Sequence, residues 1–151
     1  MRRLILAAAL ALAGCGDAGA PRDTSARMTS IVGFDPARFA GEWREVAAIG
    51  RPPGALWRVE AGPGGALAVS TSRDGAGRGE MVGPGRFRLS QFAAPLWVLW
   101  ADADMRTLVL GTPDGRFAMV LDRAARPAPD RLQAARDVLE WNGYDLGALR
   151  G

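Results

Sequence analysis

From Gly41 onward, short apolar runs alternate with turn residues along the chain. The runs predict eight strands, at about residues 42–49, 55–61, 66–72, 79–82, 85–91, 96–102, 106–112 and 116–123. Gly and Pro in the connectors favour turns, because Gly accepts a positive φ and Pro presets φ. Closely spaced strands without intervening helices predict an up-and-down sheet, and closure into a barrel hides its edges. We therefore predict an all-β fold with an eight-stranded up-and-down antiparallel barrel.

Within the predicted strands, side chains alternate as a half-buried sheet requires. In the fifth strand, Phe87 and Leu89 share one face, whereas arginines occupy the other. The sixth and seventh strands are apolar on both faces, so their outer face needs a cover other than solvent. Trp97 and Trp100 have opposite parities in the sixth strand, so we expect only one of them to point into the barrel.

One helix is predicted after the last strand, at about residues 130–142. Pro127 and Pro129 limit its start, since Pro is tolerated in a first turn. Its apolar residues recur at helical spacing and form one stripe, made of Leu132, Ala135, Val138, Leu139 and Trp141. Gly143 is typical of the position after a helix, and Tyr144 is expected to fold back onto the last turn. We expect this helix to pack on the outside of the barrel.

The N-terminal residues 1–14 have the form of a secretory signal, with a basic start and an apolar run from Leu4 to Ala13. The run is too short to span a bilayer as a helix. The residues Leu-Ala-Gly before Cys15 resemble the bacterial lipobox, in which the Cys is lipidated and becomes the new N-terminus. The alternative is a plain signal peptide with a chance Cys. The residue after the Cys is Gly16. An Asp at this position would suggest retention in the inner membrane, so Gly16 favours the outer membrane, facing the periplasm.

Residues 15–33 are rich in Gly, Ala, Ser, Asp and Arg, with almost no large apolar side chain, and are predicted to form a flexible tether. The folded domain is expected over 34–150. The net charge is +3, and every basic residue is an Arg. The arginines are scattered and form no basic stripe, so the sequence indicates no nucleic-acid partner.

Enzyme chemistry finds little support in the sequence. There is no His, which excludes a Ser-His-Asp triad, and the single Cys is the predicted lipidation site. No His/Cys metal constellation can be drawn. Asp102 and Asp104 lie beside a turn, where a solvated pair is more typical than a Ca²⁺ site or a catalytic dyad. We predict a protein that is not an enzyme and that uses no cofactor and no metal.

Three motifs carry a resemblance to a known family. Gly41 and Trp43 form a Gly-x-Trp motif at the head of the first strand, and the turn 102–107 follows the sixth strand. Arg123 ends the last strand. Together these motifs resemble the lipocalins, over residues 34–150. In that family an Arg at this position stacks over the Trp at the closed end of the barrel, so the resemblance implies a cation–π contact between Trp43 and Arg123.

The helix followed by Gly143 to Leu146 is similar to bacterial, apolipoprotein D-like lipocalins. The resemblance implies a membrane-tethered protein that binds a small hydrophobic ligand, such as a fatty acid or a lysophospholipid, inside the barrel. Strand parity places six candidate residues toward the interior: Glu45, Phe87, Leu89, Phe117, Met119 and Leu121. Core packing is the alternative for each. Glu45 serves either as a polar handle for a ligand or as one half of a buried ion pair with an Arg.

The first connector, Arg51 to Gly54, is short, whereas in the family this loop is commonly long and acts as a lid. The resemblance therefore leaves open whether the barrel is hollow or filled by its own side chains. A filled barrel is the second hypothesis: an envelope lipoprotein whose outer surface binds another protein, as an interaction or inhibitor module. A continuous apolar cavity favours the first hypothesis, and a packed interior with an exposed apolar patch favours the second.

Overall fold

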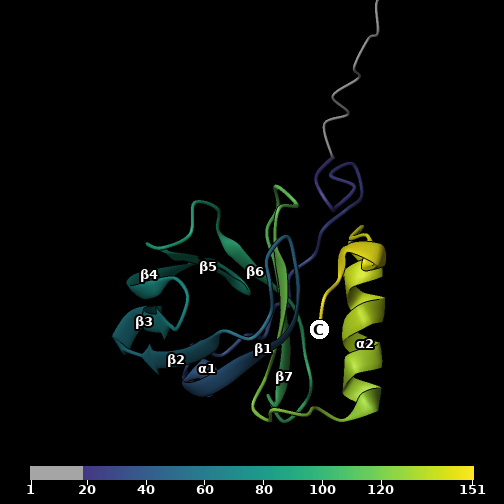
Figure 1. Ribbon diagram of the computed structural model, residues 1–151. Coiled ribbons are helices and arrows are strands. Elements are labelled where there is room, and N and C mark those ends of the chain that lie inside the picture. The colour runs from purple at the N-terminus through teal and green to yellow at the C-terminus, as the bar shows by residue number, and fades with distance from the viewer. Residues whose placement is uncertain (1–18) are drawn as a thin grey trace, which may run out of the picture.

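The computed structural model describes residues 19–151, which form a closed barrel with one long helix alongside (Figure 1). Eight antiparallel strands pair in chain order and the last pairs with the first: β1 (Gly41–Ile49), β2 (Leu56–Ala61), β3 (Ala66–Thr71), β4 (Gly75–Gly83), β5 (Arg86–Leu89), β6 (Leu96–Ala101), β7 (Thr107–Gly111) and β8 (Ala118–Asp122). The predicted eight-stranded up-and-down barrel with one outer helix is confirmed. Cys15 and the predicted signal segment 1–14 lie outside the described residues.

Three short helical turns and one long helix complete the fold. They are α1 (Pro36–Phe39), the 3-10 turn η1 (Pro63–Gly65), α2 (Pro129–Trp141) and the 3-10 turn η2 (Leu146–Ala148). Asp35 caps α1 by accepting a hydrogen bond from the Ala37 amide. The turn α1 lies at one end of the barrel, which we call the floor. The opposite end, where β1 connects to β2 and β7 to β8, is called the mouth and lies uppermost in Figure 1.

The fourth strand is longer than the sequence suggested. Residues 75–78, predicted as part of a turn because of their glycines, pair with β3, where Gly77 lies opposite Val69. Pairing along the whole edge of β3 outweighs the local turn preference of Gly. The fifth strand is shorter than predicted, because the chain turns after Leu89.

Three β-bulges interrupt the alternation of side chains between the two faces of the sheet. They lie at Val46 in β1, Val82 in β4 and Leu99 in β6. A bulge adds one residue and reverses the alternation that follows it. As a result, Trp97 and Trp100 both pack in the outer cluster beside α2, and the expectation that one of them points inside is wrong.

Apolar side chains gather in two clusters, one on each side of the sheet. The interior cluster fills the barrel and contains Trp43, Ala48, Trp57, Val59, Leu67, Val69, Phe87, Leu89, Leu96, Val98, Leu108, Leu110, Met119 and Leu121, with Phe39, Ala55 and Met105. The outer cluster lies between the sheet and α2 and contains Ala47, Ile49, Leu99, Val109, Ala118, Val120, Ala135, Leu139 and Tyr144. The helix thus covers the strands that are apolar on both faces, as predicted.

The long helix α2 ends in the turn that its sequence predicts. Gly143 has φ +85°, and its amide donates to the Glu140 carbonyl at 2.9 Å. The Tyr144 amide donates to the Leu139 carbonyl at 3.0 Å, which completes a Schellman motif. None of the helices within residues 19–151 combines the length and the apolar character needed to cross a bilayer.

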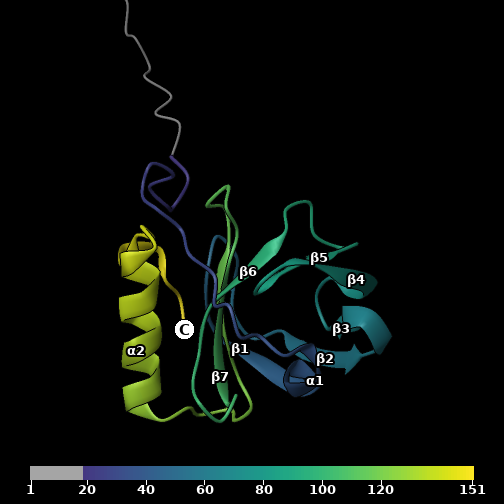
Figure 2. The same ribbon diagram turned by 180° about the vertical axis from the view of Figure 1, so that it is seen from behind.

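The segment before the barrel lies against it (Figure 2). The Asp23 amide donates to the Gly143 carbonyl at 2.8 Å, and the Ile31 amide donates to the Val98 carbonyl at 2.9 Å. Arg22 is 5% exposed, although it lies within the predicted tether 15–33. The packed unit therefore begins before the expected boundary at residue 34. The composition did not indicate this, because the segment is held mainly by main-chain hydrogen bonds and by Arg22, with only Met28 and Ile31 as large apolar contacts.

Candidate functional site

The floor of the barrel is closed by Trp43 and Arg123. The guanidinium carbon of Arg123 lies 3.7 Å from the centroid of the Trp43 ring, which confirms the predicted contact. Trp43 is 1% exposed, and its indole Nε1 donates to the Phe39 carbonyl at 2.8 Å. The guanidinium also donates to main-chain carbonyls around it at 2.9 to 3.1 Å, those of Arg38, Ala40 and Glu42. The pair therefore ties the start of β1 to the end of β8.

Gly41 makes this closure possible, as the sequence suggested. Its φ is +106°, a conformation that residues with a Cβ rarely adopt. A Cβ at this position would lie 2.8 Å from Nη1 of Arg123. The missing side chain therefore leaves room for the guanidinium over the indole. Burial lowers the pKa of Arg123 below its ordinary value, but an arginine remains charged at neutral pH.

The mouth holds a buried group of charged side chains centred on Glu45. Glu45 is 2% exposed, and its Oε1 accepts a hydrogen bond from Trp57 Nε1 at 3.0 Å. Arg51 Nη2 lies 3.2 Å from the same oxygen, and Arg73 Nη1 donates to Oε2 at 2.8 Å. Of the two roles open to Glu45, the buried ion pair with an Arg is present in the structure.

Asp74 completes this group, which we call the mouth network: Glu45, Arg51, Arg73 and Asp74. Arg51 Nη2 lies 2.7 Å from Asp74 Oδ2, and Arg73 Nη2 donates to the Pro53 carbonyl at 3.1 Å. The network thus connects the β1–β2 loop with the β3–β4 loop. The β5–β6 loop adds Phe92, whose ring stacks on Trp57 at 5.8 Å and lies 5.6 Å from the Arg51 guanidinium. Three loops therefore close the mouth together.

Two buried polar atoms at this end lack a hydrogen-bond partner among the described residues. They are Nε of Arg51 and Oε1 of Gln91. The Arg51 side chain is only 8% exposed, and Gln91 uses its amide nitrogen to donate to the Val69 carbonyl at 3.2 Å. Unsatisfied buried groups are few in native proteins and each costs about 1–3 kcal/mol. One free donor and one free acceptor are therefore available to a group that enters the mouth.

The predicted interior residues divide into two sets. Phe87, Leu89, Met119 and Leu121 are fully buried in the interior cluster. Phe117 is only partly buried and belongs to neither cluster, so its predicted place in the lumen is wrong. The reason is that β8 begins at Ala118, and the alternation of the strand does not extend into the preceding turn. A role for the four buried residues in ligand contact remains a prediction.

The lumen is packed with side chains. Phe87, Leu89, Met119 and Leu121 have no accessible surface, whereas a void that admits water would leave some on its lining. The packing is unusual along β4, which presents Gly77 and Gly79 opposite the inward residues of β3. A Cβ at Gly79 would lie 2.4 Å from Leu89 Cδ2. Side chains from the β5 segment therefore fill space that β4 leaves empty.

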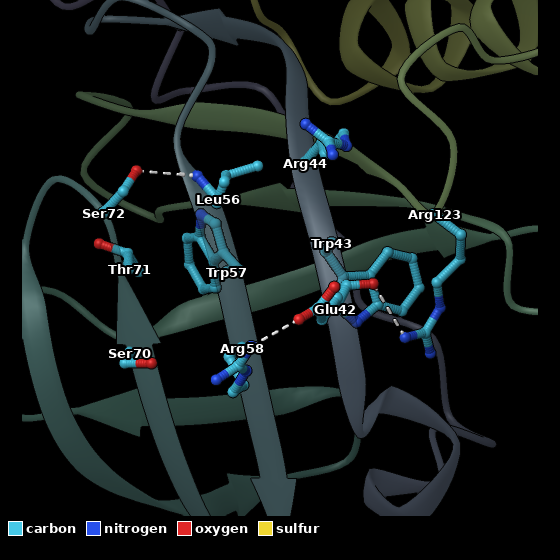
Figure 3. A pocket seen from close by; sticks show the side chains of 10 residues that line it. All are labelled: Glu42, Trp43, Arg44, Leu56, Trp57, Arg58, Ser70, Thr71, Ser72 and Arg123. Atoms are coloured by element: carbon cyan, nitrogen blue, oxygen red, sulfur yellow. Dashed lines mark hydrogen bonds and ion pairs between the residues drawn. The ribbon is translucent and has the colours of Figure 1, made fainter.

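A groove of about 360 Å³ lies outside the barrel, across β1, β2 and β3 (Figure 3). Figure 3 shows the ion pair between Glu42 and Arg58 on its surface, with a distance of 2.6 Å between Oε1 and Nη2. Leu56, 47% exposed, supplies apolar surface, and Ser72 Oγ accepts a hydrogen bond from the Leu56 amide. The groove is open, and its lining is about equally polar and apolar. Arg58 pairs with Glu42, the one acid of the lining.

Sequence reasoning missed most of the mouth network. Arg51, Arg73 and Asp74 lie in Pro- and Gly-rich connectors, where charged residues are usually solvated. One signal was available: a carboxylate at an inward position of β1 needs a cation, and the two nearest mouth loops each carry an Arg. That argument indicates an Arg partner for Glu45 without identifying the loop geometry.

Comparisons with known proteins support the fold. No protein-family model matches the chain, and no curated protein matches it in sequence. Among solved structures, the siderocalin Ex-FABP is similar at TM-score 0.59 and 18% identity, over 74% of this chain and 91% of its own. Insecticyanin from the tobacco hornworm Manduca sexta is similar at TM-score 0.58 and 15% identity, over 83% of each chain. Lobster apocrustacyanin A1 gives 0.59 and 17%, over 75% of this chain and 76% of its own.

These neighbours are lipocalins, so the barrel described here has the lipocalin fold. Identities of 15 to 18% show the shared fold alone. The resemblance noted in the sequence is therefore supported at the level of the fold, through the closed barrel, the outer helix and the Trp–Arg floor. The features that bear on function are the residues at the two ends of the barrel.

Proposed function

We propose that this protein is a membrane-tethered binding protein that takes a small hydrophobic ligand with a polar head, such as a fatty acid or a lysophospholipid, through the mouth of its barrel. The observation that carries the proposal is the mouth network. It closes an otherwise apolar interior with charged groups, and it keeps Nε of Arg51 without a partner. An anionic head group offers the acceptor that this donor lacks.

Entry of a ligand requires side chains to move, because the lumen is packed. The side chains that we expect to move are those of Gln91 and Leu89, which lie between the mouth and β4 and pack against glycines. Displacing Gln91 would break one hydrogen bond, the 3.2 Å bond to the Val69 carbonyl. Burial of an acyl chain contributes about 0.8 kcal/mol per methylene, so eight to ten methylenes correspond to roughly micromolar affinity before ordering costs.

The neighbours' names fit a binding role, although each describes its own protein. One is a siderocalin said to function through dual ligand specificities. Lipidation of Cys15 and location at the outer membrane, facing the periplasm, complete the proposal. They rest on the lipobox-like sequence, which lies outside the described residues. A diacyl anchor would hold the barrel on the membrane surface without crossing it.

The proposal can be tested by titrating the mature Cys15→Ser chain with a fluorescent fatty acid and with the corresponding fatty alcohol. We expect saturable binding, with the acid preferred at least about tenfold because one charge-assisted hydrogen bond contributes about 1.5–3 kcal/mol. Arg51→Gln should abolish the preference for the acid. Arg58→Gln, which removes an exposed Arg on the outer groove, should preserve it. Absence of saturable binding by a folded chain would contradict the carrier role.

The packed lumen favours a second candidate function. A filled barrel could act through its outer surface as an interaction or inhibitor module for another envelope protein. The groove with Leu56 and the ion pair of Glu42 and Arg58 is the available surface. A folded chain that takes up neither the acid nor the alcohol would favour this alternative over the carrier.

A further inference from the structure

The chain entering the barrel is fixed at one particular end of the molecule. The Pro21 carbonyl accepts a hydrogen bond from the Asp145 amide at 2.8 Å, and the Asp23 amide donates to the Gly143 carbonyl at 2.8 Å. Between them, Arg22 Nε donates to the Asn142 carbonyl at 2.7 Å. These contacts, which we call the clamp, hold residues 21–23 against the C-terminal end of α2.

The clamp lies at the mouth and not at the floor (Figures 1 and 2). Arg22 pairs with Tyr144, whose hydroxyl donates toward the Thr112 carbonyl at 3.0 Å in the β7–β8 connection. Arg22 Nη1 also lies 3.4 Å from the Pro113 carbonyl in that connection. The β7–β8 connection is part of the rim of the mouth, so the clamp is built on that rim.

The chain length between the clamp and the predicted anchor is short. Six positions separate Cys15 from Pro21. A fully extended chain spans at most about 3.3–3.6 Å per residue, so the Cα atom of Cys15 can lie no more than about 22 Å from that of Pro21. The floor lies farther away, because β1 alone has nine residues and spans about 30 Å. An anchor at Cys15 therefore reaches the mouth end far more readily than the floor.

A second feature at the same end points to a lipid surface. Trp141 is the last residue of α2 and is 87% exposed, beside the clamp. A Trp is rarely left so open on a soluble surface, since its ring is the largest apolar side chain. Trp is enriched at membrane–water interfaces, where its ring sits among head groups and its N–H stays hydrated.

We infer that the mouth end of the barrel is a membrane-contact face, with Trp141 in the head-group region and the floor pointing away from the bilayer. This inference rests on the proposed lipidation of Cys15. The mouth network then faces the bilayer, so that a lipid-derived ligand can pass between membrane and barrel without crossing bulk water. The partner is the lipid surface itself.

The orientation can be measured on the full lipidated chain in vesicles of phosphatidylethanolamine and phosphatidylglycerol. Cys15 is the only Cys, so an acylated chain accepts a thiol-reactive donor dye only at an introduced Cys. Arg116→Cys places the dye at the mouth and Ala37→Cys places it at the floor, both at exposed positions. Energy transfer to an acceptor in the lipid head groups should be at least about threefold stronger from the mouth, because the ends lie about 30 Å apart. Equal transfer, or stronger transfer from the floor, would overturn the inference.

Contact by Trp141 has its own test in the same vesicles. Brominated phospholipids should quench part of the tryptophan fluorescence, and Trp141→Ala should remove a large part of that quenching, because Trp43 and Trp57 are 1% exposed and Trp97 and Trp100 are partly buried against the outer cluster. Unchanged quenching would contradict the contact face.

The outcomes separate this inference from the proposed function. Mass spectrometry of the intact protein reports the acyl group directly, and a chain without it would remove the premise and overturn the inference. Failure of the fatty-acid titration would contradict the carrier role while leaving the measured orientation as it stands.

Discussion

The two ends of this barrel are closed by different chemistry. At the floor, one guanidinium covers an indole and donates to main-chain carbonyls, and no carboxylate takes part. At the mouth, two guanidiniums and two carboxylates from β1 and two loops meet, with one donor left free. The floor joins regular elements and satisfies nearly every polar atom, whereas the mouth depends on charges that another charged molecule could replace. The comparison indicates a permanent closure at one end and an exchangeable closure at the other.

The largest effect is expected at the mouth. Glu45→Ala leaves Arg51 and Arg73 with Asp74 as their one carboxylate and leaves Trp57 Nε1 without its acceptor, so we expect a loss of about 3–5 kcal/mol in the free energy of unfolding. Glu42→Ala is the matched control, because Glu42 lies on the same strand and pairs with an Arg that is 67% exposed. Its loss should be far smaller, because water screens an exposed ion pair. Urea unfolding followed by fluorescence measures both, and equal losses would remove the distinction between buried and exposed pairs.

A smaller loss is expected at the floor. Arg123→Ala removes the cover of Trp43 but leaves no unpaired charge, so the free energy of unfolding should fall by about 1–3 kcal/mol. Arg106→Ala serves as the control, since its side chain is 53% exposed in a surface ion pair. An unchanged unfolding midpoint for Arg123→Ala would show that the contact does not stabilise the barrel. Binding of the fatty acid should be altered only by substitutions at the mouth. A loss of binding in Arg123→Ala would therefore contradict the division between the two ends.

The smallest effect concerns pH and the turn between β6 and β7 at the floor. Burial alone would raise the pKa of Asp102, but hydrogen bonds from Thr107 and Arg106 lower it below its ordinary value. A lowered pKa in the folded state stabilises the protein above the unfolded value of 3.8, and this contribution is lost as the pH falls through the folded value. Asp102→Asn should therefore flatten the decline of stability between about pH 5 and about pH 2. An identical decline in both proteins would contradict this role.

The floor could be predicted from the sequence because its signals are local. Gly41 and Trp43 are two positions apart. Arg123 follows a strand whose end is predicted by its apolar run. The barrel and α2 followed from periodicity in the same way. The end of the helix was also predicted, since Gly143 and Tyr144 fit a known terminal motif.

The mouth could not be predicted in the same manner. Arg51 and Asp74 are 23 positions apart in loops, and nothing in their neighbours shows that the loops meet. The bulges at Val46 and Leu99 add single residues without any change in composition, yet they alter which side chains face inward. The clamp could not be predicted because Arg22 donates to the carbonyl of Asn142, at the end of α2, and to that of Pro113, about a hundred positions away in the sequence.

Gly77 and Gly79 of β4 make the interior of this barrel easy to alter. Because Gly77 and Gly79 contribute no side chains, the space beside them is filled largely by the side chains of Leu89 and Gln91. Shortening those two residues would hollow the chamber from one wall while the hydrogen-bonded register of the strands stays intact. Very few substitutions would therefore change the size and the polarity of the interior of such a barrel, in evolution or in protein engineering.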